Sequence, residues 1–490
     1  MLLQQHLSRM YNKCNIFINI ITKGFYMFRK SNTAPRQGLR IIIVGCGKVG
    51  VTLVEQLVKE GHDITVIDKR YTRIQETTNL YDVMGIVGNG ASYSVQMEAG
   101  IETTDLIIAV TDSDELNLLC CTVAKRVGNC AAIARVRNPD YSEEVGYLRE
   151  KLGLVLIINP ELEAAKEAAR ILYLPTALEV NSFAHGQAEL IKFKVPVHNI
   201  LDSMTVATLG HTITNDILIC AVERSNEVYI PNGDFKILSG DVLSFVAPRK
   251  AARLFLKQIG FNTKQVKNAM IIGGSKASYY LAKELINTGI DVKIIEQNKE
   301  HCQLLSALLP KAVIINGDGT DQDLLKEEGI EQIEAFIPLT GIDEENIILT
   351  LHAKQVSNAK VITKINRLNF KNVINSLDLG SLVYPSYITS EAIIAYVRAR
   401  KNSLNSNNIE TLYHMFDHRV EAIELRVLEA SPITGKALKD LNLKKDTLIS
   451  FINRNGNIII PTGNDCIAVG DTVMIVTKQT GFDNIKDITK

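Results

Sequence analysis

The sequence predicts an α/β fold of two tandem, doubly wound parallel sheets, each followed by a small α+β domain. Two observations support this prediction: short β-branched runs alternate with amphipathic stretches, and the whole plan occurs twice. An apolar strand enters a glycine turn at Gly45 and again at Gly273, an offset of 228. Matched residues further along keep offsets of 228 to 230, as in Asp68 and Glu296. Such a constant offset indicates a tandem duplication of a unit about half the chain long.

The first half of the chain alternates strand-like and helix-like segments from residue 39 onward. Expected strands cover residues 41–44, 64–68, 83–87, 106–110, 132–136 and 155–158, and expected helices cover 49–59, 71–80 and 113–127. Gly61 and Gly128 end the first and third helices, and Ser113 or Asp114 caps the third. Because crossover helices separate the strands, the segment predicts a six-stranded parallel sheet.

A helix over residues 161–172 is expected to lead into a smaller domain built of strands and turns. Its expected strands are 188–195, 217–224 and 242–246, and the second half repeats them at 421–428, 448–453 and 470–476. The predicted divisions are a basic extension (1–38), a first parallel-sheet domain (39–160), a crossover helix with a first small domain (161–262), a second parallel-sheet domain (263–390), and a linker with a second small domain (391–490). Residues 400–408, rich in Asn and Ser, suit a flexible linker.

Composition excludes several classes of protein. Lys+Arg and Asp+Glu number 54 each, so no overall positive field attracts nucleic acid, and no nucleic-acid partner is expected. The eight cysteines are scattered without a Cys-x-x-Cys pair, which favours a reducing cytoplasm and argues against a zinc site. No window of about 18 apolar residues is present to span a bilayer.

The basic extension differs from the rest of the chain. Its first 37 residues carry six Lys or Arg and no Asp or Glu, with several Phe and Ile between the charges. Two interpretations stay open: the segment lies on an anionic membrane surface or a membrane partner, or it is an over-long start before a working chain that begins near Met27.

The first glycine turn has the pattern of a dinucleotide-binding, Rossmann-like site. Gly45-x-Gly47-x-x-Gly50 follows a strand and opens a helix, and Asp68 ends the next strand. In this pattern the glycines allow a tight turn, close approach of a pyrophosphate and tight helix packing, while the helix N-terminus attracts phosphate. Asp68 would accept hydrogen bonds from ribose hydroxyls, which favours NAD or adenosine over a 2′-phosphate carrier. The alternative is a tight turn without a ligand.

Three further residues belong to the same edge of the predicted sheet. Thr111 and Asp112 end the fourth strand, at the carboxyl edge where ligands of this fold bind. Helix capping is the alternative role for polar residues here, and it suits Asp114 and Glu115 better. Arg135 in the fifth strand is expected to clamp a pyrophosphate, with a local ion pair as the alternative.

The second glycine turn has lost part of this pattern. Gly273 and Glu296 are retained, but Ser275 stands where Gly47 does, Ser278 stands where Gly50 does, and Lys364 replaces Arg135. These changes remove the space for phosphate and for helix packing. We therefore expect binding at the second turn to be weaker, altered or absent.

Together these motifs resemble the TrkA-type regulatory subunits of Trk potassium uptake systems, which have two tandem KTN/RCK domains, each with a small C-terminal regulatory domain. The resemblance covers about residues 39–480 and rests on five motifs, namely 44–50, Asp68, 88–91, 110–117 and 134–141. It implies NAD contacts at Gly45, Cys46, Gly47, Lys48, Val49, Asp68, Thr111, Asp112 and Arg135, with Gly273 and Glu296 at the second site.

The resemblance also implies a function. It suggests a non-enzymatic, cytoplasmic subunit, peripheral at the inner face of the cell membrane, that binds NAD(H), ATP or ADP. A homo-oligomeric ring would pass the response to a Trk-type potassium-translocating membrane subunit. The alternatives are a soluble NAD-dependent oxidoreductase and a metabolite-sensing module without a transporter. No histidine recurs between the repeats as a shared catalytic group, which disfavours the oxidoreductase.

Overall fold

The computed structural model describes residues 38–490, except positions 143, 214–215, 367–372, 375–376, 402–408, 417 and 483. Residues 1–37 of the basic extension and residues 402–408 of the expected linker therefore lie outside the described residues. Within the described part, no helix is both long enough and apolar enough to cross a bilayer.

The first parallel sheet has six strands in the order β3-β2-β1-β4-β5-β6. Its strands are β1 (Arg40–Val44), β2 (Asp63–Asp68), β3 (Met84–Val87), β4 (Leu106–Ala109), β5 (Ala131–Arg135) and β6 (Leu156–Ile158). The helices around it are α2 (Lys48–Lys59), α3 (Tyr71–Leu80), α4 (Tyr93–Glu98), α5 (Asp114–Val127), α6 (Pro139–Ser142) and α7 (Val145–Leu152). In β1, Ile43 lies between Val66 of β2 and Ile108 of β4. All three side chains are fully buried, as expected for a sheet covered on both faces.

The second parallel sheet repeats this topology in the order β14-β13-β12-β15-β16-β17. Its strands are β12 (Asn268–Ile272), β13 (Asp291–Glu296), β14 (Val313–Asn316), β15 (Ala335–Pro338), β16 (Lys360–Lys364) and β17 (Ser381–Val383). Its helices are α11 (Lys276–Asn287), α12 (Lys299–Leu308), α13 (Gln322–Glu327) and α14 (Asp343–Val356). The predicted duplication of a doubly wound sheet is confirmed.

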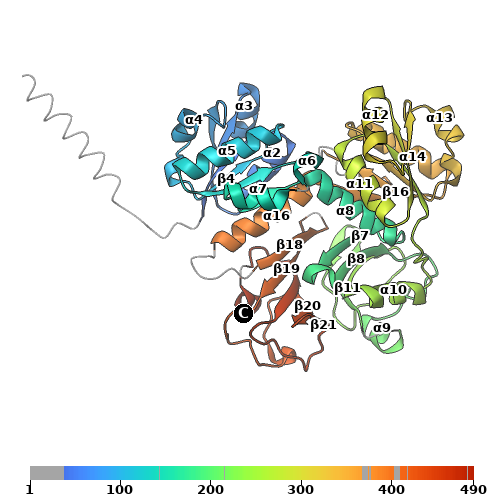
Figure 1. The fold of residues 1–490 in the computed structure, drawn as a ribbon. Coiled ribbons are helices and arrows are strands. Elements are labelled where there is room, and N and C mark those ends of the chain that lie inside the picture. The colour runs from blue at the N-terminus through green and yellow to red at the C-terminus, as the bar shows by residue number, and fades with distance from the viewer. Residues whose placement is uncertain are drawn as a thin grey trace, which may run out of the picture.

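Each parallel sheet is followed by a five-stranded antiparallel sheet, and the two small domains lie side by side below the parallel sheets in Figure 1. The first contains β7 (Glu179–Phe183), β8 (Ala188–Lys194), β9 (Leu218–Arg224), β10 (Glu227–Tyr229), β11 (Val242–Pro248), α9 (Val206–Thr212) and α10 (Arg249–Gln258). The second contains β18 (Ile409–Met415), β19 (Val420–Arg426), β20 (Thr447–Arg454), β21 (Asn457–Ile459) and β22 (Thr472–Thr477). The first small domain is therefore α+β, as predicted, while the second keeps the antiparallel sheet and, among the described residues, adds only the short 3-10 helices Leu438–Asp440 and Ile485–Ile488.

The two small domains pack through one face of each antiparallel sheet. Phe183 and Val246 of the first domain share a buried cluster with Phe451 and Met474 of the second. The side chain of Arg419 forms an ion pair with Glu223 across the same interface. Apolar burial of this kind stabilises the contact by roughly 25 cal/mol for each Å² removed from water.

Two crossover helices connect the parallel-sheet domains to the small domains, and each packs against the other half of the molecule. Helix α8 (Pro160–Tyr173) follows the first sheet but packs along α11 of the second. Its alanines, Ala164, Ala165, Ala168 and Ala169, belong to the buried cluster of the second sheet. Small side chains allow this close approach of two helices.

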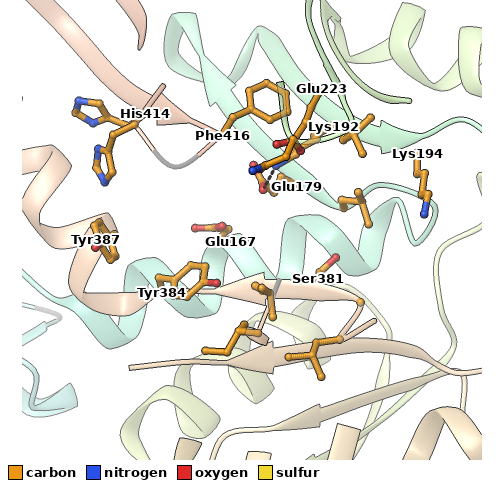
Figure 2. Close-up of a pocket in the computed structure, with 18 of the residues that line it drawn as sticks. Glu167, Glu179, Lys192, Lys194, Glu223, Ser381, Tyr384, Tyr387, His414 and Phe416 are labelled. Carbon is orange, nitrogen blue, oxygen red and sulfur yellow. Dashed lines mark hydrogen bonds and ion pairs between the residues drawn. The ribbon is translucent and has the colours of Figure 1, made fainter. Parts of the chain in front are cut away.

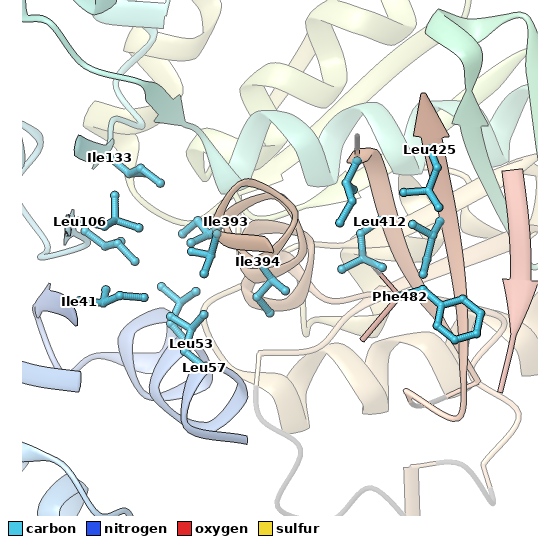
Figure 3. Close-up of a cluster of buried hydrophobic side chains, with 14 of the residues drawn as sticks. Ile41, Leu53, Leu57, Leu106, Ile133, Ile393, Ile394, Leu412, Leu425 and Phe482 are labelled. Carbon is cyan, nitrogen blue, oxygen red and sulfur yellow. The ribbon is translucent and has the colours of Figure 1, made fainter. Parts of the chain in front are cut away.

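Helix α16 (Pro385–Lys401) makes the reciprocal contact with the first half. Figure 3 shows Ile393 and Ile394 of α16 between Leu53 and Leu57 of α2 on one side and Leu412 of the second small domain on the other. Fully burying each such side chain contributes about 1.5–3 kcal/mol. The two halves therefore share their cores.

Some elements differ from the sequence expectation. Strands β7 and β18, at the start of the two small domains, were not predicted. Helix α16 runs continuously across position 390, where the sequence suggested a domain boundary, and ends at Lys401, inside the expected linker. Strand β7 was not predicted because its sequence, Glu-Val-Asn-Ser-Phe, contains only two large apolar residues.

Candidate functional site

The first glycine turn joins β1 to α2 and uses its three glycines for different reasons. Gly45 has a φ of +105°, and a Cβ atom there would lie 3.0 Å from the Thr111 nitrogen. A Cβ atom on Gly50 would lie 1.9 Å from the Gly45 carbonyl oxygen. Both positions therefore require glycine for the fold itself.

Gly47 is different, because nothing in the surrounding structure excludes a side chain there. A Cβ atom on Gly47 would meet only the Arg73 Nη1 atom, at 3.9 Å. Gly47 is the N-cap of α2, and no side chain accepts a hydrogen bond from the first turn of the helix. The first turn thus presents backbone N–H groups without a side-chain cap, in the partial positive field of the helix end.

Asp68 at the end of β2 is held beside this turn. One carboxylate oxygen accepts a hydrogen bond from the Cys46 backbone N–H at 2.8 Å, and the other accepts one from the Arg70 N–H at 2.8 Å. The Arg73 guanidinium lies 3.7 Å from the carboxylate. The predicted acid and the predicted glycine turn are therefore directly connected.

The remaining turn residues have different surroundings. Cys46 is 5% exposed, and burial, with the charge of Asp68, raises the pKa of its thiol to about 11, so the thiol stays neutral. The Val49 side chain packs into the hydrophobic core, whereas Lys48 is exposed. Neither the Cys46 nor the Val49 side chain is therefore exposed at the turn.

Thr111, Asp112 and Arg135 come together at the carboxyl edge of the sheet. The Arg135 guanidinium donates a hydrogen bond to the Thr111 carbonyl at 2.5 Å and lies 3.5 Å from the Asp112 carboxylate. Burial, with the neighbouring charge of Arg137, lowers the pKa of Arg135. Both predicted roles of Arg135 remain compatible with this position, because the exposed Asp112 carboxylate is a weak partner that an anion could replace.

The expected capping roles are partly wrong. Ser113 caps α5, since its hydroxyl oxygen accepts a hydrogen bond from the Leu116 N–H at 3.1 Å. Asp114 instead accepts hydrogen bonds from the Arg137 and Asn138 N–H groups, at 2.8 and 2.7 Å. The Asp114 carboxylate thus holds the segment after β5 in place, because it accepts from two backbone N–H groups that pair with no neighbouring strand.

Gly273 and Glu296 are also brought together in the second turn. The Gly274 N–H donates to the Glu296 carboxylate at 2.5 Å, and Gly273 has a φ of +94°. A Cβ atom on Gly274 would lie 2.8 Å from Leu305 and 2.9 Å from Glu296, so glycine here leaves room for the longer acid.

The serines of the second turn use their hydroxyls locally. Ser275 caps α11 by accepting a hydrogen bond from the Ser278 N–H at 3.3 Å. The Ser278 hydroxyl donates to the Gly273 carbonyl at 2.5 Å, where Gly50 makes its close approach in the first turn. The second helix end is therefore already capped by its own side chain, whereas the first is not.

Residues that sequence reasoning missed connect the first site to the second half. The Tyr280 hydroxyl of α11 donates to the Arg137 carbonyl at 2.9 Å, and the Asn159 side chain donates to the same hydroxyl at 2.9 Å. Glu161 lies 3.7 Å from the Arg137 guanidinium. No spacing in the sequence indicated the Tyr280 contacts, because they join residues of different halves.

Comparison with known proteins agrees with this architecture. The TrkA-N domain family matches residues 41–160 and 269–385, and the TrkA-C domain family matches residues 190–260 and 422–490. The Trk system potassium uptake protein TrkA homolog of Archaeoglobus fulgidus is 32% identical, over 92% of this chain and 100% of the relative. The Trk system potassium uptake protein TrkA of Haemophilus influenzae is 30% identical, over 92% of this chain and 98% of the relative.

Solved structures support the fold. The GsuK channel bound to NAD is similar with a TM-score of 0.59 and 17% identity, over 94% of this chain and 82% of that chain. The GsuK RCK domain is similar with a TM-score of 0.59 and 17% identity, over 92% of this chain and 96% of that chain. The family matches and the similarity to curated relatives agree over almost the whole described chain. The chain therefore belongs to the TrkA family of Trk-system potassium uptake proteins and contains both of its domain types twice.

Proposed function

We propose that the protein is the nucleotide-binding regulatory subunit of a Trk-type potassium uptake system. The observation that supports this most directly is the uncapped start of α2 at Gly47, next to the fixed carboxylate of Asp68. In this proposal NAD(H) binds with its pyrophosphate at the helix end and a ribose at Asp68, and ATP or ADP are alternative ligands. The relatives named as potassium uptake proteins supply the transport context.

The proposed role of the second half is to transmit the signal. Arg135 and Arg137 lie at the first site, and Arg137 is held by Tyr280 of the second half. A bound phosphate would attract both guanidinium groups and so shift the position of Arg137 at the contact between the halves. A nucleotide changes the conformation only if it binds one arrangement more tightly than another.

The proposed assembly is a homo-oligomeric ring at the inner face of the cell membrane, in contact with a potassium-translocating subunit. A closed ring would let each half serve as an interface. Co-purification of the membrane subunit with the full-length protein from detergent-solubilised membranes would support this placement. Turnover of NADH with a substrate by the purified protein would favour the oxidoreductase alternative instead.

Gly47→Val tests the nucleotide site with little expected cost to the fold. A branched side chain would occupy the space proposed for the pyrophosphate, so we expect the Kd for NADH to rise at least about 100-fold. Isothermal titration calorimetry measures this change. Ser275→Val, at the matching position of the second turn, should leave NADH binding nearly unchanged. Undiminished NADH affinity in a folded Gly47→Val protein would refute the proposed site.

A further inference from the structure

A cavity of about 890 Å³ lies where the two halves meet, and no residue of either glycine turn lines it. Its walls come from the crossover helix α8, strands β7 and β8 of the first small domain, the beginning of α16, and strand β18 of the second small domain. Figure 2 shows side chains from all of these elements directed toward one space. The volume falls within the range of small-molecule pockets.

Four of the five acidic groups that line the cavity have partners, since Glu223 pairs with Arg419, Asp378 pairs with Lys354, and Glu179 and Glu391 pair as follows. Glu179 accepts hydrogen bonds from the Lys192 ammonium and the Tyr413 hydroxyl, each at 2.8 Å. Glu391 lies 3.6 Å from the His414 ring nitrogen and accepts a hydrogen bond from the His414 backbone N–H at 3.2 Å. Each of these two carboxylates therefore has a cationic partner, although His414 is shared with Glu421, 3.4 Å away.

Glu167 of α8 is the exception. Its side chain is 8% exposed and lines the cavity, and Figure 2 places its carboxyl group between Tyr384 and the Glu179–Lys192 pair. Among the residues that the structure describes, none forms a hydrogen bond or an ion pair with this carboxyl group. A buried carboxylate without a counter-charge is costly, so the position favours a ligand that carries one.

The electrostatics agree with the geometry. Burial raises the pKa of Glu167 to about 8, against the opposing charge of Arg170 and with the help of Glu179, Glu391 and Glu163. Lys192 and His414 are engaged with Glu179 and Glu391. Lys194 also lines the cavity, but Figure 2 draws it beyond the Glu179–Lys192 pair, so neither lysine nor His414 pairs with the Glu167 carboxyl group.

The remaining lining favours an organic cation over a metal ion. Four aromatic residues, Tyr384, Tyr387, Tyr413 and Phe416, line the cavity, and the Lys192 ammonium lies 4.6 Å from the centre of the Phe416 ring. Aromatic faces attract ammonium groups. No cluster of three or more potential metal ligands occurs among the described residues. The space also exceeds what a single ion would fill.

We propose that this cavity binds a small organic ammonium ion whose nitrogen pairs with the Glu167 carboxylate and whose body lies against the surrounding aromatic rings. Because both crossover helices and both small domains contribute walls, a ligand here stabilises the observed arrangement of the two halves. The site is separate from the nucleotide turns and does not depend on the nucleotide proposal.

Calorimetry with defined probes tests the proposal on the full-length protein. We expect saturable binding of n-butylammonium or 2-phenylethylammonium with a Kd below about 1 mM. Glu167→Gln should weaken it at least about tenfold. Glu163→Gln is the matched control, because Glu163 lies one turn earlier on α8, half exposed and paired with Lys166. Gly47→Val should leave binding unchanged, and Glu163→Gln should change it far less than Glu167→Gln, because Glu163 is the smallest of the charges that act on Glu167.

Proton release gives a test that needs no variant. At pH 7 the empty site holds Glu167 mostly protonated, so binding of a cation should release a proton, and the affinity should rise toward pH 8 and then level off. Heats measured in buffers of different ionisation enthalpy report this release. The proposal fails if no ammonium probe binds saturably, if Glu167→Gln binds equally well, or if KCl or MgCl₂ alone gives the same heats.

Discussion

Gly47 and Gly50 stand three residues apart in one turn, yet they serve different purposes. Any side chain at Gly50 would collide with the Gly45 carbonyl, whereas a side chain at Gly47 would meet only the Arg73 guanidinium. In the second turn, Ser278 stands at the position of Gly50, and its hydroxyl donates a hydrogen bond to the Gly273 carbonyl instead of colliding with it. Loss of the third glycine therefore leaves the turn intact, and Ser275 is the change that affects the proposed ligand space.

The carboxylate of Asp68 should select the unphosphorylated ribose. A 2′-phosphate beside this carboxylate is repelled, so we expect NADPH to bind at least about tenfold more weakly than NADH. Asp68→Asn keeps one hydrogen-bond acceptor for the turn but removes the charge, so the affinities for NADH and NADPH should become more alike. Competition titrations with the two nucleotides measure both affinities. Equal affinities in the wild type would contradict the prediction and point to Arg73, which lies 3.7 Å from Asp68.

At the scale of elements, α16 is fixed to its neighbours by charge as well as by apolar packing. Arg398 is 4% exposed and donates hydrogen bonds to Glu60 after α2 and to Glu421 of β19. Although burial alone would raise the pKa of Glu421, hydrogen bonds from Arg398 and the His414 ring 3.4 Å away lower it to about 2. The network joins the first parallel-sheet domain, the crossover helix and the second small domain.

His414 makes this network dependent on pH. Although burial opposes its charge, the carboxylates of Glu391 and Glu421, 3.6 and 3.4 Å from its ring nitrogens, raise the pKa of His414 to about 9. A raised pKa means that the stabilisation is complete below the ordinary value of about 6.5 and is lost as the pH rises through 9.

His414→Gln should therefore lower the urea midpoint of unfolding at pH 6, by an amount corresponding to about 1–3 kcal/mol. The difference between wild type and variant should shrink steadily between pH 7 and pH 9.5. Comparing the two proteins at each pH cancels the titration of groups that His414 does not contact, such as Glu167. A difference that stays constant over this range would show that His414 is not charged in the folded protein.

At the scale of the whole molecule, the two halves are alike in scaffold and unlike in their glycine turns. Both keep the same strand order and the same partly buried Thr–Asn hydrogen bond, Thr111 with Asn117 and Thr340 with Asn346. Only the first half presents an uncapped helix at its turn. This asymmetry suggests that the first half senses the nucleotide and the second mainly supplies interfaces.

Potassium uptake by cells that lack their own subunit tests this division. Gly47→Val should abolish the nucleotide-dependent part of uptake, because the proposed phosphate space is filled. Glu296→Ala should change it much less, although it removes the acceptor for the Gly274 N–H. Equal loss of control from both substitutions would show that the second site also works and that Ser275 is tolerated there.

Much of the local structure could be predicted from the sequence. The glycine turns, the acids at Asp68 and Glu296 and most strands follow from residue types at short spacing, because backbone geometry and helix ends depend on neighbours along the chain. The placement of Arg135 beside Thr111 and Asp112 follows too, since parallel strands end at one edge of a sheet. Whether these residues bind a nucleotide stays a prediction.

The sequence by itself determined the duplication, the two kinds of domain in each half and the difference between the two glycine turns. Only the tertiary structure decided that α8 packs on α11 and α16 on α2, and that Glu167 faces a shared cavity. The apolar face of a crossover helix shows that the helix must be buried, but the two similar halves offer two similar surfaces on which it could pack. The choice between them depends on contacts between residues hundreds of positions apart, which no local pattern contains.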